Sequence, residues 1–254
     1  MPENIRMTCQ SCRIFLCLVM AMIIGCNDSG TESPVIHPGI KGYVVLYSDG
    51  ITPLGDSSGV TVSADGPVRD SVVTSRGGHW TLTPLPPGTY SLTFSKQGFG
   101  LKKIANVHLP SDKQIDLGRV IMVHKPWFNL TSLSIAPEDS EMLISGDFSY
   151  SGGSYFGATV AFFMDTTDLV FQDLSHYISY ATTFVPPPST SYELHLTRAD
   201  IQTLLGLSSG TQVYVTAVTA SALFVFSGYQ DSTSGNWVFT AVGDSLKGSS
   251  FTIP

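Results

Sequence analysis

Cysteine and charged residues are scarce in this sequence. Four of the 254 residues are cysteines, and all lie within the first 26 positions: Cys9, Cys12, Cys17 and Cys26. The rest of the chain cannot form an internal disulfide and must fold without one. Charged residues make up 13% of the chain, where a soluble domain usually has roughly 25%. Such a composition favours strands and turns over charged surface helices.

The charge that is present is mostly acidic. The sequence has 20 Asp and Glu residues against 13 Lys and Arg, a net charge of −7. Binding to nucleic acid or to an anionic membrane surface requires a basic patch. We therefore predict no nucleic-acid partner.

Motifs of common catalytic sites are also missing. None of the six histidines has a glutamate at the spacing that a zinc peptidase requires. The nearest match to a serine-hydrolase elbow, residues 152–157, has the wrong spacing. No glycine-rich phosphate loop is present. We predict a protein that is not an enzyme, with no catalytic residues, no cofactor and no metal site.

Three polar patterns leave alternatives open. Glu193 and His195 share one face of a predicted strand, so they could form a ligand or acid–base pair. The same alternation is typical of the solvated face of a half-buried strand. The acidic loops 165–168 and 231–235 could hold calcium weakly, but turns favour the same residues.

Aromatic residues are common, and two adjacent ones fall in a glycine-rich loop. Tyr155 and Phe156 lie within the stretch Gly152-Gly-Ser-Tyr-Phe-Gly157. An exposed ring can stack on a sugar or contact a protein partner. We predict Tyr155 and Phe156 as binding residues.

The N-terminus has the parts of an export signal. Arg6 and Arg13 precede an apolar run, Ile14–Ile24, which is about half the length that a membrane-spanning helix needs. The run ends in Ile23-Ile24-Gly25-Cys26, which resembles the lipobox of bacterial lipoproteins. That resemblance implies a signal peptide over 1–25 and a lipid on Cys26. An ordinary signal peptide cut near Gly25 is the alternative.

The lipobox resemblance also implies a location. The polar residues after Cys26 predict a flexible tether over 26–37. We expect a lipid-anchored protein of a bacterial cell envelope, in the outer membrane, with the membrane itself as one partner.

Strand signals with period two begin at Gly39. Alternate positions are apolar in three stretches, and the expected core residues are Ile40, Val44, Leu46; Val60, Val62, Ala64; and Tyr90, Leu92, Phe94. Trp80 and Leu82 share one face of a further strand, after the turn 76–78. A last strand holds Leu117, Val120 and Met122. Several short strands at regular spacing predict a sandwich or barrel.

These stretches resemble a known family. Gly39-Ile-Lys-Gly-Tyr-Val, Gly77-Gly-His-Trp-Thr-Leu and Leu85-Pro-Pro-Gly-Thr-Tyr-Ser-Leu are similar to segments of the carboxypeptidase regulatory-like domain. Gly98-Phe and Asp116-Leu-Gly-Arg-Val add to the likeness. The resemblance covers about residues 38–123 and implies a seven-stranded, transthyretin-like sandwich without catalytic residues. Ser75 departs from it, because many members carry an acid near the glycine turn.

Pro126 ends the last of these strands, so we place a boundary there. The predicted domains are 38–124 and 127–254. In the second, we expect strands near 128–135, 141–150, 158–165, 177–184, 191–196, 212–221, 237–242 and 249–253. A short helix is predicted from Arg198 to Leu205, with Thr197 as N-cap and Asp200 as its capping partner. A loop is predicted over 228–235.

The second domain resembles fibronectin type III-like or immunoglobulin-like domains. Leu207–Ala220 is similar to the sixth strand of the former, although the tyrosine comes one residue late, at Tyr214. The predicted fold class is therefore all-β, with two consecutive β-sandwich domains after a cleaved signal peptide.

The predicted function is that of a membrane-anchored, non-enzymatic envelope lipoprotein acting as a binding or assembly module for a protein or glycan partner. A surface adhesin or a carbohydrate-binding accessory protein is the alternative, and an enzyme with an unrecognised site is the least favoured.

Four short segments are similar to an O-glycosylation acceptor used by one broad group of bacteria: Asp70-Ser-Val, Asp165-Thr-Thr, Asp231-Ser-Thr and Asp244-Ser-Leu. Asp-Ser and Asp-Thr are also ordinary turn pairs. Modification needs an exposed hydroxyl, so we predict Thr166 and Ser232 as the acceptors. We expect sheet pairing to close Ser71.

Overall fold

The structure is a computed structural model that describes residues 37–48, 52–138, 141–150, 157–171 and 174–253. These belong to one compact unit, Ile36–Pro254. The predicted leader, the lipid acceptor Cys26, and Tyr155 with Phe156 lie outside the described residues. Within the described residues, no helix is long and apolar enough to cross a membrane.

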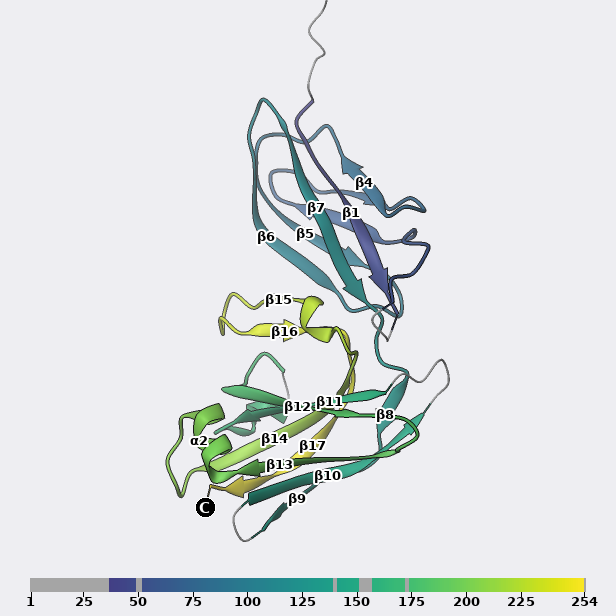
Figure 1. The fold of residues 1–254 in the computed structure, drawn as a ribbon. Helices are drawn as coiled ribbons and strands as arrows, with labels where there is room; N and C mark the ends of the chain where they lie inside the picture. Colours follow the sequence, from purple (N-terminus) through teal and green to yellow (C-terminus); the bar gives the residue numbers. More distant parts are fainter. Residues whose placement is uncertain (1–36, 49–51, 139–140, 151–156, 172–173, 254) are drawn as a thin grey trace, which may run out of the picture. The chain divides into compact units, whose positions relative to one another are not determined.

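The first seven strands form two facing sheets (Figure 1). Their bounds are β1 Gly39–Tyr47, β2 Thr61–Asp65, β3 Asp70–Val73, β4 His79–Leu82, β5 Gly88–Ser95, β6 Lys102–Leu109 and β7 Gln114–Val123. One sheet has the order β4-β1-β7 and the other β3-β2-β5-β6. β1 and β7 pair in parallel, and the other pairs are antiparallel. The expected seven-stranded sandwich is confirmed.

The core between these sheets is the one that the alternation predicts. All nine residues expected from the three alternating stretches are buried. Trp80 is 3% exposed and Tyr90 is fully buried, which confirms the predicted strand faces. Trp80 packs edge-on against Phe94 at 5.5 Å between ring centres. The hydroxyl of Tyr90 donates to the carbonyl of Pro86 at 2.8 Å, so the ring also holds the turn before β5.

The expected last strand is interrupted by an irregularity. Leu117 is half-buried and packs against the core that contains Val120 and Met122, although it is an odd number of positions from both. Gly118 takes φ 63°, a left-handed conformation that suits glycine, and the β1–β7 register shifts at this point. This irregularity changes the face on which the side chains fall, so a strict period of two fails across it.

The second group of strands also forms two sheets (Figure 1). The bounds are β8 Phe128–Leu130, β9 Ser134–Pro137, β10 Glu141–Tyr150, β11 Ala158–Asp165, β12 Ser179–Val185, β13 Ser191–Thr197, β14 Gln212–Ala220 and β17 Val242–Thr252. One sheet has the order β13-β10-β8, and β9 in this sheet also pairs with β10. The other sheet has the order β12-β11-β14-β17. Apolar side chains of both sheets share one core. The chain is thus all-β, with two consecutive sandwiches. The exact domain boundaries stay a prediction.

The single predicted helix is confirmed. α2 spans Arg198–Leu205, and its capping box is complete. The backbone N–H of Asp200 donates to the hydroxyl of Thr197, and the carboxylate of Asp200 accepts from the backbone N–H of Thr197. Gly206 ends the helix in the left-handed conformation. Two short 3₁₀ turns, η1 Asp168–Phe171 and η2 Phe224–Phe226, also occur.

The strand predicted near 128–135 is in fact two strands. β8 and β9 both pair with β10, on either side of an interruption at Thr131–Leu133. There the carbonyl of Asp147 accepts from the N–H groups of both Thr131 and Ser132. Two residues thus share one partner, which breaks the ladder.

The predicted loop 228–235 contains a strand. β15 Gly228–Gln230 pairs with β16 Trp237–Phe239 as a hairpin. The glycines that bound this segment concealed the strand, because glycine is depleted in strands and common in turns. The predicted strand 237–242 ends at Phe239, and β17 begins earlier than expected, at Val242.

Candidate functional site

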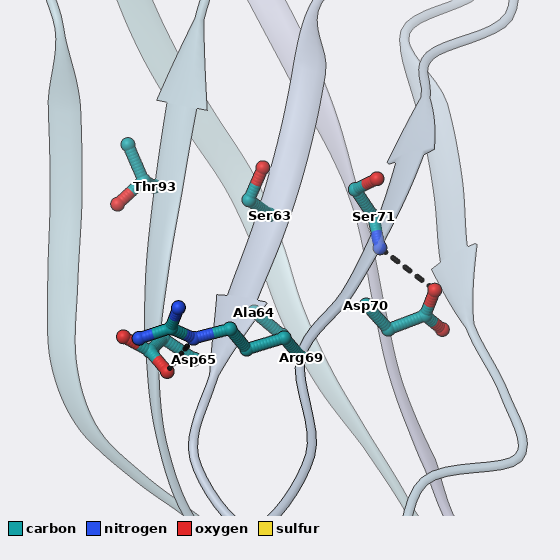
Figure 2. A pocket seen from close by; sticks show the side chains of 7 residues that line it. All are labelled: Ser63, Ala64, Asp65, Arg69, Asp70, Ser71 and Thr93. Carbon is teal, nitrogen blue, oxygen red and sulfur yellow. Dashed lines mark hydrogen bonds and ion pairs between the residues drawn. The ribbon is translucent and has the colours of Figure 1, made fainter.

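The outer face of the sheet β3-β2-β5-β6 carries a row of hydroxyl side chains. Because Val62 and Phe94 point into the core, their strand neighbours Ser63 and Thr93 point outward. Ser63 lies opposite Ser71 on one side and opposite Thr93 on the other. Figure 2 shows these three side chains on adjacent strands.

This row continues to a basic residue and a ring. Thr93 lies opposite Lys103 on β6. The Nζ of Lys103 is 4.0 Å from the centre of the Tyr229 ring, on β15. Four strands and one hairpin therefore contribute to a single row, and all of its members are at least partly exposed.

A hollow of about 520 Å³ lies over the first part of the row. Its lining is Ser63, Ala64, Asp65, Arg69, Asp70, Ser71 and Thr93 (Figure 2). The Nε of Arg69 donates to Oδ1 of Asp65 at 3.0 Å, and both side chains are mostly exposed. An exposed pair of this kind stabilises the fold little, so both groups can exchange it for contacts with a ligand.

A second hollow, of about 670 Å³, adjoins the first and shares Thr93 with it. Its lining includes Lys103, Asn106, Tyr229 and Trp237. Asn106 has a positive φ of 59°, beside a register shift between β5 and β6. Asparagine tolerates this conformation, and bulges commonly redirect side chains at functional sites.

Lys102 lies over the Trp237 ring. Its Nζ is 4.7 Å from the centre of that ring and donates to the carbonyl of Phe226 at 3.2 Å. Burial lowers the pKa of this lysine from its usual value. The side chain of Lys102 on β6 therefore contacts the hairpin β15–β16. The backbones of β6 and β15 also lie close together.

Asp231, which also lines the second hollow, is held by its own loop. Its Oδ2 accepts from the backbone N–H of Ser234 at 2.6 Å and of Thr233 at 3.0 Å. The hydrogen bonds from Ser234 lower the pKa of this carboxyl below its usual value. Asp165 likewise accepts from the N–H of Thr167. Both aspartates therefore make the hydrogen bonds of ordinary turns. Turn formation is the alternative to calcium binding that the sequence leaves open for these two loops.

The predicted modification sites fall in different surroundings. Ser232 is exposed and lines the second hollow. Thr166 is partly exposed, just after β11. Ser71 is exposed, although we expected sheet pairing to close it, because only its backbone pairs with β2 while its side chain points outward. The predicted binding residues Tyr155 and Phe156 lie outside the described residues.

The hydroxyl row itself is missing from the sequence prediction. Its signal was present as Ser or Thr at alternate positions of β2 and β5, between core residues. Only the strand register shows that Ser63, Ser71 and Thr93 are neighbours. The linings of the two hollows include neither histidine nor cysteine among the described residues. This set of groups can donate and accept hydrogen bonds and stack on a ligand.

Comparison with known proteins identifies the first sandwich. Residues 39–122 match the model of the carboxypeptidase regulatory-like domain. The family resemblance expected from the sequence is confirmed for this part of the chain. No curated protein matches the chain.

Solved structures align over most of the chain at low similarity. A "putative carbohydrate binding protein" from Bacteroides uniformis is 10% identical, with 85% of this chain and 99% of that chain covered and a TM-score of 0.33. A DUF3823 family protein from Parabacteroides merdae is 15% identical, with 82% and 98% covered and a TM-score of 0.30. The chicken CNTN1 FN1–FN3 domains are 10% identical, with 85% and 65% covered and a TM-score of 0.25. TM-scores this low support no inference about function.

Proposed function

We propose that this chain is a lipid-anchored, non-enzymatic lipoprotein of a bacterial cell envelope that binds a glycan across the outer face of β3-β2-β5-β6. The observation that carries the glycan proposal is the continuous row from Ser71 through Ser63 and Thr93 to Lys103 and the Tyr229 ring.

The chemistry of the row suits a sugar better than an apolar ligand. Serine and threonine hydroxyls both donate and accept hydrogen bonds, as sugar hydroxyls do. Carboxylates of Asp65 and Asp70 add acceptors, and Arg69 adds donors. The partly exposed rings of Tyr229 and Trp237 offer apolar faces to the C–H side of a sugar ring.

The size and charge of the site narrow the ligand class. Each hollow has a volume within the range of about 300–1,000 Å³ usual for small-ligand sites, and the two adjoin at Thr93. Acidic and basic side chains are mixed along the row, so no single sign of charge dominates. An uncharged oligosaccharide of several units fits this arrangement.

Anchoring is supported by the sequence alone. The segment Ile23-Ile24-Gly25-Cys26 resembles a lipobox, and the polar residues after it would act as a tether. A tethered module with an open binding face suits capture of glycans at an envelope surface.

A glycan array followed by calorimetric titration of the best oligosaccharide tests the proposal. Thr93→Arg places a long cation where the two hollows meet, and we expect it to weaken binding at least tenfold. Thr81→Arg is the matched control, because Thr81 is exposed on β4 of the other sheet. Equal affinity of wild type and Thr93→Arg, or no oligosaccharide bound by wild type, would refute the proposal.

A further inference from the structure

Three potential metal ligands meet at one end of the sheet β13-β10-β8. Glu138 follows β9, Glu141 opens β10, and His195 lies in β13. The N–H of Glu138 donates to the carbonyl of Glu141 at 2.8 Å, which brings the two glutamates together at the β9–β10 connection. His195 lies opposite Leu143, two residues along β10 from Glu141.

The geometry of the three side chains is compact. One ligand atom of each lies within 4.8 Å of the others. The Nδ1 of His195 is 2.9 Å from Oε1 of Glu141. The side chain of Glu141 is less exposed than that of His195: 29% of its surface is accessible, against 49% for the histidine.

We propose that Glu138, Glu141 and His195 bind a zinc-like divalent transition-metal ion. An imidazole nitrogen with carboxylate oxygens is a donor set typical of zinc, whereas calcium and magnesium prefer oxygen alone. Three protein ligands leave a fourth position of a tetrahedral ion open to water or to an external ligand. The site is separate from the hydroxyl row, which lies on the sheet β3-β2-β5-β6 and ends at the hairpin β15–β16.

Glu193 is placed to orient the histidine. Its Oε2 is 3.7 Å from Nε2 of His195, on the side of the ring away from Glu141. Metal-bound histidines commonly donate their second N–H to a carboxylate, which fixes the ring and strengthens the ligand. We assign Glu193 as a positioning residue and Nδ1 as the metal-binding atom.

The cluster contains one carboxylate more than the ion pair between His195 and Glu141. The hydrogen bond with Glu141 raises the pKa of His195 above its usual value, as a simple pair would. A pair needs only one carboxylate, whereas here Glu138 also places an oxygen within the same 4.8 Å. Two carboxylate oxygens and one imidazole nitrogen within this distance form a donor set that a cation completes.

The sequence predicted no metal site because these residues are far apart in the chain. Glu141 and His195 are separated by 54 positions and show none of the short spacings of known zinc motifs. The sequence predicts Glu193 and His195 as a possible pair, but β13 alone offers only one carboxylate. Strand pairing with β10 supplies the others.

The test is zinc titration of the full chain, without a histidine tag and with its cysteines alkylated, in competition with a chromophoric chelator. Wild type should bind one Zn²⁺, and zinc should raise its melting temperature. His195→Gln and Glu141→Gln should each weaken binding at least tenfold. Glu193→Gln should weaken it less than His195→Gln, consistent with a positioning role.

His108→Gln is the matched control, because His108 is exposed on β6, and it should bind as wild type does. Glu138→Gln is a second probe at the exposed end of the hairpin, should Glu141→Gln fail to fold. The proposal is overturned if wild type binds no Zn²⁺ at micromolar concentration, or if His195→Gln binds as wild type does.

Discussion

The ammonium of Lys103 on β6 lies 4.0 Å from the centre of the Tyr229 ring on β15. This contact joins the hydroxyl row to the hairpin β15–β16 and closes one end of the proposed glycan site. Nearby, Ser227 accepts a hydrogen bond from the N–H of Val123 at 3.0 Å. Val123 itself is buried in a small core with Phe163 and Phe239. The hairpin is therefore held by apolar packing, and Lys103 mainly shapes the surface.

Lys103→Ala should weaken oligosaccharide binding several-fold while changing stability only slightly. The cation–ring contact contributes about 0.5–1 kcal/mol at an exposed site, and its loss frees the Tyr229 ring. Calorimetric titration and urea denaturation measure the two effects. Lys113→Ala, an exposed lysine just before β7, should leave both unchanged. A large loss of stability without loss of affinity would assign Lys103 a structural role.

Trp80→Ala should destabilise the first sandwich by about 3–5 kcal/mol. The side chain is 3% exposed, and its removal leaves a large cavity between the sheets. Chemical denaturation followed by circular dichroism measures the loss. Thr81→Ala changes the exposed neighbour on the same strand and should cost no more than about 0.5 kcal/mol. A cost below 1 kcal/mol for Trp80→Ala would show that the tryptophan does not fill the core.

The capping box of α2 predicts both a mutational and a pH effect. Thr197→Ala should cost about 1 kcal/mol, because it removes the side-chain acceptor at the N-cap. Hydrogen bonds from Thr197 lower the pKa of Asp200 below its ordinary 3.8. The contribution of Asp200 is therefore complete above that value and is lost as the pH falls through the lower folded pKa.

Denaturation of Asp200→Asn and wild type between pH 2 and 6 checks the pH effect. The stability difference should shrink toward acid as the wild-type carboxylate protonates. Gln202→Ala, at an exposed position of the same helix, should follow wild type throughout. A difference that stays constant over this range would contradict the role of the charged form.

Cys26→Ser should release the protein from the membrane or leave an uncut precursor. The hydroxyl cannot form the thioether to lipid that the lipobox resemblance implies. Fractionation of cells and the mass of the product give the result. Cys17→Ser, within the apolar run, should be processed and anchored normally. A membrane-bound, normally processed Cys26→Ser protein would remove the lipobox interpretation.

Intact mass of the mature protein from its native host tests O-glycosylation. Ser232 is exposed in the β15–β16 connection, and Thr166 is partly exposed after β11. We expect added hexose-like mass that decreases in Ser232→Ala or Thr166→Ala. Ser71 is also accessible, so Ser71→Ala belongs in the series. A mass equal to lipid plus bare polypeptide would end the hypothesis.

Local patterns were sufficient for much of the fold. Alternation placed Ile40, Val62 and Phe94 in the core, because successive side chains of a strand point to opposite faces. The helix ends were also readable, since Thr197 and Gly206 satisfy the end groups of α2 through local contacts. Strict alternation breaks between Leu117 and Val120, which both face the core because the left-handed Gly118 changes the side-chain phase.

Tertiary structure alone decided which polar residues are neighbours. Ser63 meets Ser71 and Thr93, and Glu141 meets His195, only through strand register. Register depends on how whole sheets pack their apolar faces and on where bulges fall. A single strand shows which of its side chains point outward, but not which side chains of other strands stand beside them. The sequence by itself therefore determined the all-β class and the core faces, whereas sheet pairing decided both proposed sites.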